Sequence, residues 1–399
     1  MQIRNRSKSW RPLIHLVLAL SFLAIAATGF AEGNISSGVD LKFWGKAKFD
    51  MQYDTGQQFV DFMGFLTDDT TEQFSFNPRD TRFGFKASSS QGRWTYSGVF
   101  EIDFYGWNAS NNLLPRMRLG YAEAKKDNGI SFRGGQDWVP VAAQNPGTLD
   151  FGVQSWSGNL WWRVPQFTFR YMPDKIEFLV SVMKHRVSNS QEQQEKMPWI
   201  LGRIGFSDLL GAGSLLALGG GVRSASDVAL TSVAGTDTSD YSSSLVALEL
   251  KVPLGKKFVL NGEIYTGKGI GREFIHYGFD YNPSFTGGGK VVESTGGFVS
   301  LKFAASPKVA LNAGYGMDDP KDEDMAFDDM NGTGDPIVSF SGPYLKNSTY
   351  FINLKYSVTK NFGWGVEFIN FTTQVGDATG ASTTDLEGQR FTGSWWYSF

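Results

Sequence analysis

Apolar and polar side chains alternate with a period of two along membrane-length segments of this chain, and this pattern restricts its fold more than any other feature. In the segment 39–54, the alternate positions Val39, Leu41, Phe43 and Phe49 are apolar, and the positions between them are mostly polar or charged. Successive side chains of a β-strand point to opposite faces, so such a segment has one apolar and one polar face. Strands in soluble sheets usually run about five or six residues, so repeated longer segments favour strands that span a membrane.

The same alternation recurs to the C-terminus in sixteen segments. We predict strands over residues 39–54, 79–89, 93–106, 114–125, 129–138, 161–172, 175–186, 198–207, 212–224, 242–253, 257–267, 295–304, 308–318, 347–357, 361–372 and 386–399. Short connections rich in turn residues alternate with long ones, one of which runs from Gln57 to Pro78. The pattern therefore predicts an all-β fold, a transmembrane antiparallel up-and-down β-barrel of about 16 strands with long extracellular loops and short periplasmic turns.

The first 31 residues predict a secretory signal peptide, because four basic residues precede an apolar run over 13–27 and small residues end it. That run is shorter than the roughly 20 residues that a transmembrane helix needs. Residues 32–399 are then the barrel domain, exported through the periplasm to the outer membrane of a Gram-negative bacterium.

Charge and cysteine content exclude several functional classes. Without the predicted signal peptide, 33 Lys and Arg face 40 Asp and Glu, so the chain lacks the basic excess that nucleic-acid binding requires. The chain has no cysteine, which excludes disulfides, thiolate metal sites and cysteine nucleophiles. We expect no nucleic-acid partner.

The last predicted strand places aromatic residues at alternate positions and ends on Tyr397 and Phe399. It resembles the terminal strand that the bacterial barrel-assembly machinery recognises. We interpret Tyr397 and Phe399 as an assembly signal, since an ordinary edge strand would leave an exposed hydrophobic edge.

If the apolar positions face lipid, the alternate positions deliver many basic side chains into the lumen. The predicted pore-lining residues are Lys42, Lys46, Lys48, Arg82, Lys86, Arg116, Arg118, Arg133, Arg163 and Arg170. Solvation or pairing across strands explains any one of them. The group is stronger evidence, because guanidinium groups on adjacent strands can bind a carboxylate or phosphate bidentately. Arg82, Arg116, Arg118 and Arg133 are the strongest candidates to face an anion.

The connection over 139–160 resembles the inward-folded constriction loop of general porins, with an external cap as the alternative. Opposed charges at such a loop set the size and charge selectivity of a pore. We predict acidic pore residues at Glu101, Asp103, Asp137 and Asp150, with Asp137 and Asp150 opposite the arginines.

Enzyme and metal chemistry find little support in the sequence. Beyond the predicted signal peptide the chain has only His185 and His276, and it has no G-x-S-x-G motif. The acidic stretch over 318–335 lacks the calcium-loop pattern of a glycine at the sixth place and a glutamate at the twelfth. We expect no catalytic activity, no metal site and no cofactor.

Several pieces between residues 43 and 171 resemble the DcaP-like family of outer-membrane porins in their residues, order and spacing. They are the residues NPRDTRFGF at 77–85, EIDFYG at 101–106, RMRLGYA at 116–122, GQDW at 135–138 and PGTLDF at 146–151. The resemblance implies a homotrimer of barrels associated with uptake of small anions such as dicarboxylates.

Together these observations predict an outer-membrane porin for passive diffusion of small polar solutes, with a bias to small anions. The alternatives are a phosphate or oxyanion-selective porin, and a non-conducting barrel that anchors a surface or adhesive protein. The expected partners are small polar or anionic solutes, outer-membrane lipid and lipopolysaccharide, the barrel-assembly machinery and two further copies of the chain.

Overall fold

The structure is a computed structural model, and it describes residues 38–106, 113–186, 197–229, 238–275, 280–282, 290–325, 344–376 and 383–399. The predicted signal peptide lies outside these residues.

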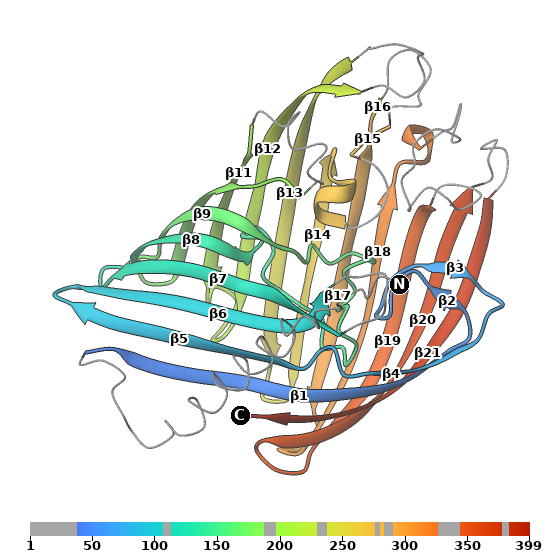
Figure 1. Cartoon of the computed structure of the whole chain (residues 1–399), viewed down its shortest axis with the longest axis horizontal. Coiled ribbons are helices and arrows are strands. Elements are labelled where there is room, and N and C mark those ends of the chain that lie inside the picture. Colours follow the sequence, from blue (N-terminus) through green and yellow to red (C-terminus); the bar gives the residue numbers. More distant parts are fainter. Residues whose placement is uncertain are drawn as a thin grey trace, which may run out of the picture.

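Sixteen long strands form one antiparallel sheet that closes on itself as a barrel (Figure 1). They are β1 (Asp40–Asp54), β5 (Arg82–Gln91), β6 (Trp94–Gly106), β7 (Leu114–Lys126), β8 (Ile130–Trp138), β9 (Arg163–Tyr171), β10 (Ile176–Met183), β11 (Trp199–Ser207), β12 (Leu215–Ala229), β13 (Thr238–Leu254), β14 (Phe258–Lys268), β17 (Glu293–Ala304), β18 (Val309–Pro320), β19 (Tyr344–Ser357), β20 (Phe362–Gly376) and β21 (Thr383–Ser398). Each overlaps one of the predicted segments. The prediction of a barrel of about 16 strands is confirmed.

The barrel closes between its first and last strands. β1 pairs with β21 from Lys46 opposite Ser398 to Asp54 opposite Arg390. The other edge of β1 pairs with β5, where Lys42 lies opposite Lys86. Both edges of β1 are therefore hydrogen-bonded, which removes the open sheet edge that hydrocarbon does not tolerate.

The remaining elements are short. They are β2 (Gln57–Gln58), β3 (Leu66–Asp68), β4 (Gln73–Asn77), β15 (Tyr281–Asn282), β16 (Lys290–Val291), the π-helix η1 (Gly271–Ile275) and the 3-10 helix η2 (Asp322–Asp324). β4 pairs with the second half of β1 and continues the line of β5. In the described part of the chain, no helix has the length and apolar character needed to cross a membrane.

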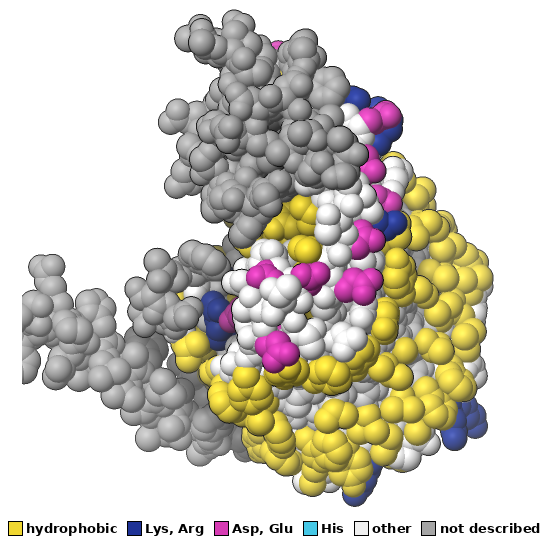
Figure 2. Space-filling view, turned by 90° about the vertical axis from the view of Figure 1, so that its right-hand side faces the viewer, with side chains coloured by type: hydrophobic (Ala, Val, Ile, Leu, Met, Phe, Trp, Pro, Cys, Tyr) yellow, Lys and Arg dark blue, Asp and Glu magenta, His cyan; other side chains and the backbone are white. Residues whose placement is uncertain are grey.

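Alternate residues of the strands make the outer face of the barrel apolar. Ile264 is 63% exposed and Phe76 is 60% exposed, although both are large hydrophobic side chains. Figure 2 shows hydrophobic side chains spread over the outer face, with acidic side chains gathered on the surface beside them. Exposed bulky apolar residues around a closed sheet are those of a barrel whose outer wall contacts lipid.

The segment between β1 and β4 differs from the long external loop expected over Gln57 to Pro78. Met63, Phe65 and Leu66 are completely buried, and Phe65 packs on Trp156 with 5.1 Å between ring centroids. The Nδ2 group of Asn347 on β19 donates a hydrogen bond to the carbonyl of Gly64 at 3.2 Å. This segment therefore packs against the barrel wall and the β8–β9 connection, because its run of apolar residues has to leave water.

Candidate functional site

Residues 139–160, called here the crossing segment, connect β8 to β9 and are held by carboxylates of distant strands. Glu249 on β13 accepts a hydrogen bond from the backbone N–H of Ala143 at 2.7 Å. Glu367 on β20 accepts two, from Leu149 and Asp150, each at 2.7 Å. Glu263 on β14 accepts one from Leu160 at 2.6 Å. Buried backbone N–H groups need acceptors, and the strand carboxylates supply them where a loop has no sheet partner.

Asp150 lies at the centre of this packing. Its carboxylate accepts hydrogen bonds from Arg390 of β21 at 2.8 Å and from the backbone N–H of Met63 at 2.7 Å. Arg390 also forms two hydrogen bonds to Asp54 of β1, at 2.7 and 3.0 Å. The contact joins the crossing segment, the β1–β4 connection and the seam between β1 and β21.

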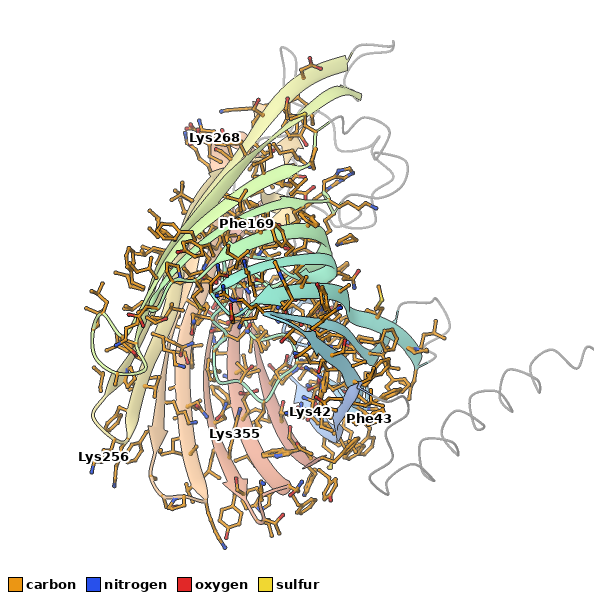
Figure 3. The ribbon with its side chains drawn as sticks, turned by 90° about the vertical axis from the view of Figure 1, so that its left-hand side faces the viewer. Lys42, Phe43, Phe169, Lys256, Lys268 and Lys355 are labelled. Carbon is orange, nitrogen blue, oxygen red and sulfur yellow. The ribbon has the colours of Figure 1, made fainter. Side chains whose placement is uncertain are left out.

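Seven cationic side chains near the crossing segment form a group that we call the basic cluster. Its members are Lys46, Lys48, Arg82, Arg116, Arg118, Arg163 and Lys355. Four of the seven, Lys46, Lys48, Arg82 and Lys355, line one cavity. Arg116 and Arg118 pair with Asp103, and Lys355 is drawn among the strands in Figure 3. The cavity has a volume of about 310 Å³ and is also lined by Thr148, Leu149 and Phe151 of the crossing segment.

Three members of the basic cluster share a single carboxylate, Asp80. Lys46 lies 2.7 Å and Lys48 lies 3.3 Å from it, and Arg82 forms a short ion pair with it. Asp80 is only 3% exposed. Lys48 also pairs with Asp50 at 2.7 Å, so three cations face two buried carboxylates, which leaves a local excess of positive charge.

Arg116 and Arg118 on β7 pair with the acids that the sequence assigned to the pore. Arg116 contacts Asp103 at 2.8 Å, and Arg118 contacts Asp103 at 2.8 Å and Glu101 at 2.7 Å. Arg118 is 2% exposed, whereas the Arg116 side chain is 31% exposed. Arg116 can therefore meet a solute directly, and Arg118 cannot.

Arg163 on β9 completes the basic cluster. Its guanidinium lies 4.6 Å from the ring centroid of Trp138 and 4.7 Å from that of Trp161. Arg116 and Arg118 are among its nearest charged neighbours. One of its terminal nitrogens has no hydrogen-bond partner within the described residues.

Arg133 lies apart from the basic cluster, in a second group with Arg170 and Arg203. Arg133 pairs with Glu123 at 2.7 Å and with Asp137 on its own strand. The second arginine group lines a cavity of about 220 Å³ below residues 139–145. Arg170 pairs with Glu177 at 2.7 Å, and Arg203 pairs with Glu177 and with Glu249.

The expected opposition of Asp137 and Asp150 to the arginines takes a different form. Asp137 pairs with Arg133, four residues earlier on the same strand, and Asp150 pairs with Arg390. Lys42 and Lys86 lie opposite each other near the short-turn end of β1 and β5, away from the basic cluster. Tyr397 and Phe399 are 50% and 59% exposed, and the backbone of Phe399 pairs with Gly45.

Asp80, Lys355, Glu367 and Arg390 belong to this site, although sequence reasoning did not select them. Asp80 stands in a piece of sequence that resembles a known family, and the other three occupy lumen-facing positions of their strands. Their alternation identified the face on which they lie. Lys355, Glu367 and Arg390 are important because they contact the crossing segment, which lies more than 200 residues away in sequence. No local sequence pattern shows these contacts.

The acidic stretch over 318–335 is described only as far as Met325. Within the described residues, no group of three or more His, Asp and Glu side chains is placed to hold a metal ion. Lys290 forms an ion pair with Asp324 at 2.5 Å, and Tyr265 donates a hydrogen bond to Asp318.

No family model and no curated protein matches the sequence. Solved structures do match. The outer membrane channel DcaP of Acinetobacter baumannii superposes with a TM-score of 0.74 at 18% identity, over 92% of this chain and 99% of that chain. OmpF of Salmonella typhi superposes with a TM-score of 0.60 at 14% identity, over 91% of this chain and 98% of that chain. An anion-selective porin from Comamonas acidovorans superposes with a TM-score of 0.58 at 12% identity, over 90% of this chain and 100% of that chain. The chain has the fold of the outer-membrane porins.

Proposed function

We propose that this protein is a porin of the bacterial outer membrane that admits small polar solutes by diffusion and favours small anions. The observation that carries the proposal is the excess of positive charge in the basic cluster. Five of its seven cations, Lys46, Lys48, Arg82, Arg116 and Arg118, form ion pairs with four carboxylates, Asp50, Asp80, Glu101 and Asp103. Low-dielectric walls strengthen the attraction of such a surface for an anion.

The crossing segment supports this function as the wall that narrows the pore. Its carbonyl groups at Leu149 and Thr148 accept hydrogen bonds from Lys48 at 2.8 Å and Lys355 at 2.9 Å. A segment fixed at both its N–H and its C=O groups keeps a constant distance from the opposite wall. A fixed aperture lined by charge selects solutes by size and charge.

Small carboxylates, including dicarboxylates, fit the chemistry of this wall. Arg116 and Arg163 present planar guanidinium groups, which bind carboxylates bidentately, and Lys46 adds a point charge. The matched porin from Comamonas acidovorans is described as anion-selective, which is compatible with this proposal.

Three copies of the barrel, lipid and lipopolysaccharide around it, and the assembly machinery at its last strand complete the proposal. The trimer is supported by the likeness to porin structures, and its test is the number of equal conductance steps per insertion event. An oxyanion-selective pore is the second candidate, because the same guanidinium groups bind phosphate.

Planar-bilayer recording tests the function directly. We expect ohmic channels whose reversal potential under a KCl gradient shifts toward the chloride potential. A shift toward the potassium potential contradicts the anion preference, and an absence of conductance favours the alternative of a barrel that only anchors a surface protein. Liposome swelling with succinate, phosphate, glucose and amino acids then ranks the solutes.

A further inference from the structure

Four lysines on three consecutive short turns form a continuous row at one rim of the barrel, which we call the lysine arc. Lys256 and Lys257 lie between β13 and β14, Lys308 between β17 and β18, and Lys360 between β19 and β20. All four are exposed. The residues from 254 to 258, 304 to 309 and 357 to 362 include no Asp or Glu.

Backbone hydrogen bonds join these turns edge to edge. The carbonyl of Lys257 accepts from the N–H of Ala304 at 2.7 Å, and that of Lys308 accepts from the N–H of Ser357 at 2.8 Å. Adjacent turns are two strands apart, or about 10 Å. The four cations are therefore fixed in a row on a rigid sheet.

The lysine arc lies directly against the apolar outer face. The ammonium of Lys257 is 6.0 Å from the ring centroid of Phe303, which stacks on Phe258 with 4.7 Å between centroids. Phe258, Leu254 and Val358 are 40%, 49% and 40% exposed beside the lysines. Aromatic residues at the end of an apolar band mark the level of the lipid headgroups.

Two cations elsewhere on the same rim are arranged differently. Arg93 pairs with Asp127 at 2.8 Å, and Lys175 pairs with Asp208 at 3.3 Å. Hydrogen bonds from Arg93 and from the backbone of Gly213 lower the pKa of Asp127 and Asp208, so both carboxylates stay ionised at neutral pH. These cations have intramolecular partners, whereas the sequence of the arc turns contains none for its lysines.

We propose that the lysine arc binds the anionic headgroups of phospholipids in the leaflet at the short-turn end of the barrel. The headgroup level of the arc and its phosphate-compatible charge favour lipid. Lysines next to an anionic lipid surface each contribute substantially to attraction, and salt weakens it. Lys256 and Lys268 lie at opposite ends of β14 in Figure 3, so the two rims can be tested separately.

The test replaces Lys256, Lys257, Lys308 and Lys360 with Gln in one variant. A control variant carries the same loss of charge outside the arc, at Lys175, Lys268, Lys321 and Lys346, each of which belongs to an ion pair. Both variants and the native protein are placed in mixed micelles of phosphatidylglycerol and phosphatidylcholine with identical acyl chains. Native mass spectrometry then counts each bound lipid.

We expect the native protein and the control to enrich phosphatidylglycerol, and the arc variant to lose roughly fivefold or more of that enrichment. Equal enrichment in the arc variant, or none in the native protein, overturns the proposal. Retention of muropeptides by the native protein without lipid enrichment also overturns it and assigns the arc to the cell wall. Single-channel conductance should be the same in all three proteins, so a failure here is distinguishable from a failure of the proposed porin function.

Discussion

Arg390 of β21 donates a hydrogen bond to Asp150 of the crossing segment at 2.8 Å, and both side chains are at most 2% exposed. The same guanidinium pairs with Asp54 of β1. One cation therefore holds two buried carboxylates from different parts of the barrel. Removing it leaves both without their partner.

Arg390→Met should lower the free energy of unfolding by about 3 to 5 kcal/mol, because breaking a buried pair strands its charges. Urea unfolding of the protein in micelles measures this loss. Arg93→Met is the matched control, since its pair with Asp127 is exposed and its loss should lower the free energy of unfolding far less. Equal losses in the two variants would contradict the assigned role of Arg390.

Glu367→Gln should loosen the crossing segment. The native carboxylate accepts hydrogen bonds from the N–H groups of Leu149 and Asp150, and an amide nitrogen cannot replace one of its oxygens as acceptor. A buried N–H without an acceptor costs about 1 to 3 kcal/mol. We expect noisier open-channel current in bilayers.

Glu387→Gln provides the comparison for Glu367, because Glu387 is an exposed residue of the neighbouring strand. Its current should resemble that of the native protein. If the open-channel current of the Glu367→Gln variant is no noisier than that of the native protein, other contacts suffice to hold the crossing segment.

Arg82→Gln combined with Arg163→Gln should reduce anion preference. The change removes two cations of the basic cluster, Arg82, which pairs with Asp80, and Arg163, which lies beside two tryptophan rings. The reversal potential under a KCl gradient should move toward the potassium potential. Arg93→Gln with Lys175→Gln is the control, because it removes the same charge at the rim and should leave the reversal potential unchanged. Equal reversal potentials in the two double variants would exclude the basic cluster from charge selectivity.

Gly316→Ala should push the crossing segment away from β18. A Cβ atom at Gly316 would overlap the backbone oxygen of Ser157, which cannot rotate away as a side chain can. Such overpacking costs about 1 to 3 kcal/mol. Gly98→Ala is the control, because no atom lies within 4 Å of its added Cβ. Thermal unfolding measures the effect, and equal midpoints for the two variants would show that the crossing segment adjusts to the added Cβ.

The strands could be predicted from the sequence because the lipid and the lumen impose opposite polarities on successive side chains. Residues 39–53 show the pattern with Trp44 as the exception among the polar positions, and β1 occupies almost the same residues. The same alternation predicts which cations lie on the polar face of each strand. Local chemistry was sufficient for the strands.

The grouping of the cations could not be predicted in the same way. A bulge at β7 shifts the register between Glu101 and Ile102, and Arg133 falls in the second arginine group while Arg163 joins the basic cluster. Charge reversal of Arg116 and Arg118 would place two more acids beside Asp103. Arg118 is buried there, so that variant tests folding rather than permeation.

The seam between β1 and β21 joins residues that are more than 300 positions apart in the chain. Hairpins can assemble one after another from neighbouring strands. Each partial sheet keeps two edges with unpaired backbone N–H and C=O groups until β1 and β21 pair. Hydrocarbon strongly disfavours such edges. Insertion into the bilayer must therefore be coupled to closure of the barrel. A catalyst that covers both sheet edges would act on the closure step, which has the largest entropic barrier.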